Sequence, residues 1–245
     1  MSQSSVGGAI DPREYDIEYE TAASRNMLEK RIPARLNTVK LTLVDVEKRG
    51  AYEPWRLALM VDFVASIECN CEQLLETMPK DRLPASAWIA RNLLELLVWV
   101  KYCGVSRENA WRLHEDALRD AKGLVELHAK SCVAWGIVDA TSTTAFQRIR
   151  QLASKELGLK DIDSDFLSVA KAAKAPGVNL GDRFGPLRRS LSKFAHPTAG
   201  LVHGIMHQAG VCRQLQALFT TQGVYYAAQS TLAVEAQLGI PELPE

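Results

Sequence analysis

The stretch WIARNLLELLVWVKY, residues 88–102, carries apolar side chains around most of the circumference of a helix. A helix that is apolar on nearly all faces is buried among other elements. The alternating polar and apolar runs, rich in Val, Ile and Thr, that are typical of half-buried strands are absent from the rest of the sequence. The stretch therefore predicts the central helix of an all-α protein.

Start and stop signals divide the remaining sequence into further helices. Pro54 and Pro84 suit a first helical turn, Ser106 suits an N-cap, and Gly50 and Gly104 suit helix ends. The glycines and prolines of residues 175–186 predict a loop. The expected helices cover residues 14–30 (ending near Pro33), 34–48, 54–78, 84–103, 106–135, 139 or 141 to 158, 163–174, a segment after Pro186, and 198–238 as one long helix or two stacked ones.

A chain of 245 residues is long enough to bury one sizeable core. We predict a single multi-helix bundle of about eight helices at residues 51–245. A helical extension at residues 14–50 and a flexible tail at residues 1–13 are expected to precede it.

Composition narrows the class of protein. Lys plus Arg equals Asp plus Glu, at 29 each. This balance argues against a protein whose whole surface binds nucleic acid, but it allows a local basic patch. The five cysteines are an odd number, four of them in apolar helical context, and we expect reduced thiols in a cytoplasmic protein. No run approaches the roughly 18 apolar residues that span a bilayer, so no membrane is expected. No cofactor is expected either.

Two charges interrupt the apolar stretch. Arg91 and Glu95 lie four residues apart, so they share a helix face and can pair. The pair is either an ion pair on a solvent-facing strip or a buried polar cluster that orients a residue from another helix. Asp62, a single acid in the apolar run LALMVDFVAS, poses the same question.

A second informative stretch is RRSLSKFAHPTAGLVHGIMH, residues 188–207. Arg189, Lys193 and His196 share one face of a helix by their spacing. Arginine binds phosphate through a planar fork, and histidine can take or give a proton near neutral pH. Pro197 predicts that the helix ends or kinks at His196. The other interpretation is that His196 caps the helix and the cations form a solvated face.

The segment RRSLSKFAHPTAG, residues 188–200, resembles the arginine–spacer–histidine signature of the HEPN superfamily, all-α nucleotide-binding domains of higher eukaryotes and prokaryotes. The segment ARNLLELLVWVKYC, residues 90–103, is similar to an earlier helix of bacterial relatives with a late His-Pro pair. The likeness covers about residues 54–238. Ser190 departs from the Asn, Asp or His that many active members carry after the arginine.

The resemblance implies a HEPN-like core and, for an active member, a metal-independent endoribonuclease or RNA-binding effector of toxin or phage-defence type. It also implies a homodimer that brings two motifs to one cleft. By the resemblance, Arg189 and His196 would be catalytic. The residues expected to bind substrate or support these two are Arg188, Lys193, Arg91 and Glu95.

Two alternatives stay open. In the first, the chain is a non-catalytic all-α sensor or a module that binds a protein partner, and His196 is a structural residue. In the second, the chain is a helical bundle in which His203 and His207, four residues apart, bind one metal ion. Asp62 or Glu95 would then supply a carboxylate near both imidazoles.

Overall fold

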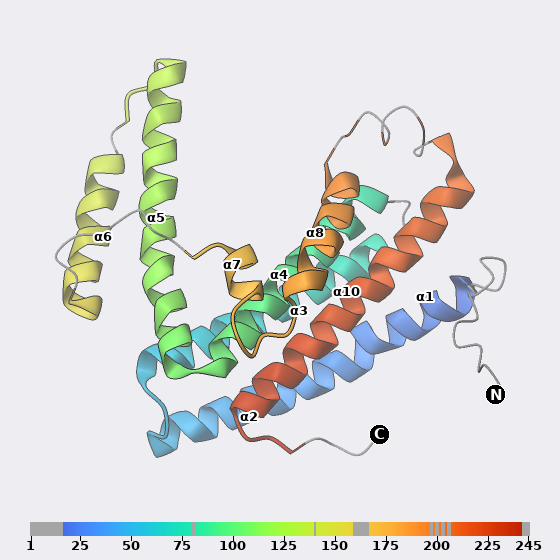
Figure 1. Cartoon of the computed structure of the whole chain (residues 1–245), viewed down its shortest axis with the longest axis horizontal. Coiled ribbons are helices and arrows are strands. Elements are labelled where there is room, and N and C mark those ends of the chain that lie inside the picture. The colour runs from blue at the N-terminus through green and yellow to red at the C-terminus, as the bar shows by residue number, and fades with distance from the viewer. Residues whose placement is uncertain are drawn as a thin grey trace, which may run out of the picture.

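The computed structural model describes residues 17–79, 82–139, 141–158, 167–196, 198, 201, 204 and 207–241. These residues form helices and no strand, which confirms the predicted all-α bundle of about eight helices (Figure 1). The expected tail at residues 1–13 lies outside them. In chain order the elements are α1 (Ile17–Asn26), η1 (Met27–Arg31), α2 (Ile32–Arg49), α3 (Pro54–Thr77), α4 (Leu83–Val105), α5 (Arg107–Trp135), α6 (Ser142–Leu157), α7 (Val169–Ala173), α8 (Gly181–Ala195) and α10 (Ala209–Gln237).

The first helical unit runs without a break through α1, the π-helical segment η1 and α2. The prediction that this helix ends near Pro33 is wrong, because Pro33 lies in the first turn of α2. The backbone N–H of Ile32 donates to the carbonyl of Met27, five residues earlier. The wider π turn accommodates the proline ring, which crowds the preceding turn and brings no N–H donor.

The central helix is α4, as predicted. It packs against α10, α8, α3 and α5, and side chains such as Leu93, Leu94 and Val98 are fully buried. The expectation that no segment is long and apolar enough to span a bilayer is wrong for α4, which passes that test by length and composition. It is the one helix in the described residues that does so. Of that apolar window, 56% is buried inside the bundle, as in the core helix of a globular protein.

The helices α10 and α4 approach each other closely at Gly223. A Cβ atom at this position would lie 2.7 Å from Cδ2 of Leu74 and 3.5 Å from Cα of Ala90. Leu74 and Ala90 are both fully buried. Glycine therefore removes the side chain that would otherwise separate α10 from α3 and α4.

The helix α5 extends away from the bundle, with α6 alongside it (Figure 1). Ser106 caps α5 as predicted, since its Oγ accepts the N–H of Asn109 at 3.1 Å. The helix ends at Gly136, which adopts the left-handed conformation with φ of +66°. Ile149 and Ala153 of α6 pack with α5 in a small core separate from the main one.

A buried ion pair anchors the base of this arm. Nη1 of Arg119 lies 3.0 Å from Oδ1 of Asp116, and both side chains are almost fully buried. Oδ2 of Asp116 accepts the backbone N–H of Leu167 at 2.8 Å. The chain that follows α6 is thereby fastened to α5 before it enters α7.

The loop before α8 is shorter than predicted. The helix begins at Gly181, so Pro186 lies inside it rather than in front of it. At that position the proline removes a single helical hydrogen bond close to the N-terminus. Asn179, with φ of +59°, makes the turn that leads into α8.

Two other boundaries differ from the prediction. The helix α7 is shorter than the expected segment 163–174, of which residues 163–166 lie outside the described part of the chain. Residues 198–238 are not one continuous helix, because α10 begins at Ala209; the alternative of two stacked helices stays a prediction, since part of residues 199–206 lies outside the described residues. Ser168 caps the start of α7, since its Oγ accepts the N–H of Lys171 at 3.3 Å, whereas no side chain caps the start of α10.

All five cysteines are free thiols, four of them buried, which agrees with their predicted use as small core residues. Burial raises the pKa of both Cys71 and Cys103 to about 12. Cys69 is exposed on the face of α3 opposite to the core.

Candidate functional site

A cluster of four charged and polar side chains joins the end of α8 to the middle of α4. We call it the Arg–His cluster, and it consists of Arg91, Glu95, Arg188 and His196. The Glu95 carboxylate is its centre: Oε1 accepts Nε–H of Arg91 at 3.0 Å and Nε–H of Arg188 at 2.6 Å. These three side chains are partly buried, with 19%, 25% and 38% of Arg91, Glu95 and Arg188 exposed. The predicted pairing of Arg91 with Glu95 is confirmed, and the pair also holds a residue of another helix.

His196 lies at the exposed end of α8. It is the C-cap residue, with φ of −115° and ψ of 149°, so the helix ends where the following proline predicted. Its Nε2 lies 3.3 Å from Nη1 of Arg91. The backbone after it turns at once, since the N–H of Thr198 donates to the His196 carbonyl at 2.8 Å. An imidazole at an exposed helix end is thus held by a guanidinium from the central helix.

Arg189 and Lys193 lie on the exposed side of α8. Nε of Arg189 donates only a long hydrogen bond, of 3.4 Å, to the carbonyl of Gly185. Residues 188–196 contain no acidic side chain. Arg91 and Arg188 contact the Glu95 carboxylate, and Arg189 and Lys193 add two exposed positive charges on α8, an arrangement that attracts anions.

The helical phase of α8 explains which arginine reaches Glu95. Phe184 and Leu191 are buried against the core, with Leu187 and Phe194 partly buried beside them. Arg188 is four residues after Phe184 and three before Leu191, so it borders this apolar stripe. Arg189 is rotated by about a further 100° toward solvent.

The other predicted site residues are not brought to this cluster within the described part of the chain. Asp62 is exposed on α3 and lines a groove between α2 and α3. His207 is exposed ahead of α10. His203 and Pro197 lie outside the described residues, so the prediction of a metal site at His203 and His207 stays a prediction.

Sequence reasoning named all members of the cluster but missed the contact between Arg91 and His196. These residues are 105 positions apart in the chain. No local pattern in the sequence reports such a contact, although the apolar stripe of α8 does indicate that Arg188 is the arginine that faces inward.

Comparisons with family models, with curated proteins and with solved structures each found no match to this chain.

Proposed function

We propose that this chain is a HEPN-like RNA-binding effector and metal-independent endoribonuclease that acts at the Arg–His cluster. The observation that carries the proposal is the contact of 3.3 Å between Nη1 of Arg91 and Nε2 of His196. A guanidinium only donates hydrogen bonds, so a hydrogen bond here requires a lone pair on Nε2, which a neutral imidazole with its proton on Nδ1 supplies. A neutral imidazole is the form that can remove a proton from a hydroxyl group.

In this proposal an RNA phosphate competes with His196 and Glu95 for the arginines. When Arg91 turns to the phosphate, the lone pair on Nε2 of His196 becomes available. Nε2 takes the proton of a ribose 2′-hydroxyl, and the 2′-oxygen attacks the adjacent phosphorus. The 5′-oxygen of the next nucleotide leaves with a proton from solvent, and a 2′,3′-cyclic phosphate forms. Arg188 and Arg189 stabilise the negative charge that builds on the phosphate oxygens.

The resemblance also motivates the oligomeric state that we propose, and the thiols motivate the cellular location. Two copies of the chain would form a homodimer and place two Arg–His clusters in one cleft. The free thiols suit a reducing compartment, which favours the cytoplasm. Light scattering on the purified chain measures the number of copies in solution.

The direct test is cleavage of a fluorescent RNA in the presence of EDTA. We expect the wild-type protein to cut RNA and His196→Ala to lose about 100-fold or more of the rate, the usual loss when a general base is removed. The matched control is His207→Ala, which removes another exposed histidine outside the cluster. Equal rates in wild-type protein and His196→Ala, or no cleavage by any variant, would refute the catalytic role.

A second candidate function is a non-catalytic module that binds a protein partner. It is favoured by Glu95, which ties an arginine of α4 to an arginine of α8 and so joins two helices. Glu95→Gln separates the two functions. If the arginines bind phosphate, removing the competing carboxylate strengthens RNA binding in fluorescence anisotropy, and added salt weakens it. If the cluster only joins helices, the variant is less stable and binds RNA no better than the wild-type protein.

A further inference from the structure

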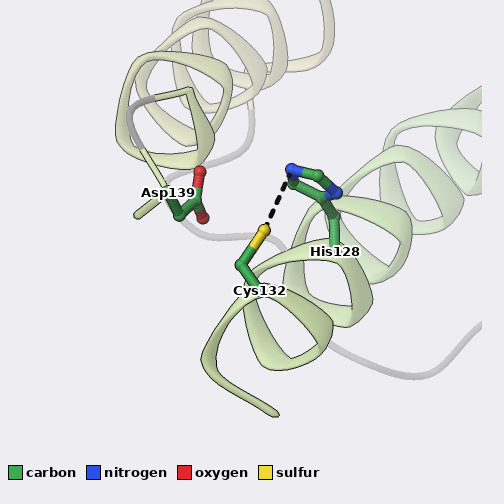
Figure 2. A group of neighbouring side chains, drawn as sticks. All are labelled: His128, Cys132 and Asp139. Carbon is green, nitrogen blue, oxygen red and sulfur yellow. Dashed lines mark hydrogen bonds between the residues drawn. The ribbon is translucent and has the colours of Figure 1, made fainter. Parts of the chain in front are cut away.

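A second group of reactive side chains lies at the far end of the α5–α6 arm. His128 and Cys132 are four residues apart on the last turns of α5, and Asp139 follows the helix (Figure 2). One ligand atom from each residue, a ring nitrogen, Sγ and a carboxylate oxygen, all lie within 4.8 Å of one another. Figure 2 shows the three side chains pointing toward a common point.

The backbone between these residues builds the group. Gly136, with φ of +66°, reverses the chain at the end of α5, and the N–H of Ile137 donates to the Cys132 carbonyl at 2.8 Å. This turn returns Asp139 to the helix face that carries His128 and Cys132. The three residues therefore come together through local geometry within 12 consecutive positions, 128–139.

The Asp139 carboxylate is held in place and charged. Its Oδ1 accepts the backbone N–H groups of Thr141 at 3.1 Å and Ser142 at 2.9 Å, and these bonds cap the start of α6. Hydrogen bonding to Ser142, and then to Thr141, lowers the pKa of Asp139 to about 2. The backbone N–H groups of Thr141 and Ser142 and the Thr141 hydroxyl all donate to Oδ1. Figure 2 shows the carboxylate beside His128 and Cys132.

From this geometry we propose that His128, Cys132 and Asp139 form a Zn²⁺ site with three protein ligands and a fourth, open position. Tetrahedral zinc has Zn–S of about 2.3 Å and Zn–N of about 2.0–2.1 Å, so its sulfur and nitrogen ligands are about 3.6 Å apart. Sγ of Cys132 lies 3.5 Å from Nε2 of His128, the separation that zinc requires. Imidazole, thiolate and carboxylate are all ligands that zinc accepts.

Binding at this site fastens the end of α5 to the start of α6. Cys132 enters as a thiolate, so uptake of the metal releases its proton to solvent. His128 is exposed, Asp139 is half-buried and Cys132 is buried, so the ion would enter from the histidine side. The site is distant in sequence from the Arg–His cluster and does not depend on the function proposed for it.

The test is titration of Co²⁺, and then of Zn²⁺ in competition, into the metal-stripped full chain under reducing conditions. We expect the visible bands of tetrahedral Co²⁺ and a thiolate-to-cobalt charge-transfer band at one equivalent, both removed by zinc. Cys132→Ser should lose the charge-transfer band, and Asp139→Asn should weaken the affinity by more than about 100-fold, since even outer-shell partners are worth about 10–100-fold. Asn retains the cap on α6, so that variant separates loss of a ligand from loss of folding.

The matched control is Cys69→Ser, which removes the exposed cysteine of α3 and should bind cobalt as the wild-type protein does. The absence of bands in the wild-type protein, or the same bands in Cys132→Ser, overturns the proposal. Loss of the bands in His207→Ala with retention in Cys132→Ser would place the metal elsewhere and overturn it equally.

Discussion

The close approach at Gly223 makes a quantitative prediction about the core. Replacing glycine by alanine inside a helix stabilises that helix by about 1 kcal/mol. In Gly223→Ala the new methyl group would lie 2.7 Å from Cδ2 of Leu74, a fully buried side chain. Inserting a methyl group into a packed core costs about 1–3 kcal/mol. We expect Gly223→Ala to lower the free energy of unfolding by about 0–2 kcal/mol in spite of its better helix propensity.

Gly123→Ala is the matched control, because Gly123 lies inside α5 and a Cβ there meets nothing within 4 Å. This variant should gain about 1 kcal/mol, so the two variants should differ by about 1–3 kcal/mol. Urea titration followed by far-UV circular dichroism measures both free energies. Leu74→Ala in the Gly223→Ala background removes the clashing atoms, and the coupling between the two changes should be favourable. Gly223→Ala with the same stability gain as Gly123→Ala would refute the close approach.

Three other outcomes follow from the packing and the titrating groups. Arg35→Ala should destabilise the fold by about 3 kcal/mol in urea titration, because it removes the ion pair of Arg35 with the buried Glu235 carboxylate, and Glu235→Gln in the same background should recover part of that loss. A maleimide reagent should label the exposed Cys69 in the native protein and reach Cys71 and Cys103 only after denaturation, as peptide mass spectrometry would show; early labelling of the buried pair would contradict their burial. The pKa of Asp139 is lowered to about 2, so its stabilisation of α6 is complete above the unfolded pKa of about 3.9 and is lost as pH falls toward 2; Asp139→Asn should flatten the pH dependence of helicity in this range.

Most of the fold could be predicted because its signals are local. Apolar periodicity indicates the helices, and residues such as Ser106, Gly50 and Gly158 cap them where expected. The two errors at prolines have a common cause. Pro33 and Pro186 each predict a helix boundary, yet a π turn accommodates the first and a position near the helix start tolerates the second.

The Arg–His cluster could be predicted only in part. The four-residue spacing of Arg91 and Glu95 predicts their pairing. Pro197 predicts that the helix ends at His196, the residue before it. The sequence does not show that α8 packs on α4, and this packing is what brings His196 to Arg91. The spacing of His128 and Cys132 is equally visible in the sequence, but the contribution of Asp139 depends on the reversal at Gly136.

The π-helical segment η1 sets the rotational phase of the N-terminal helix. Ser24 before it contacts Thr221 at 3.3 Å, and Arg35 after it binds Glu235, so both halves present a residue to α10. An α-helix turns by about 100° per residue. A π turn holds about one residue more than an α turn, so η1 takes in an extra residue without rotating α1 against α2. Deleting one residue within 27–31 would therefore let the segment continue as an ordinary α-helix, with Ser24 still facing Thr221. Deleting one residue from a regular α-helical turn would instead rotate the two halves by about 100° against each other.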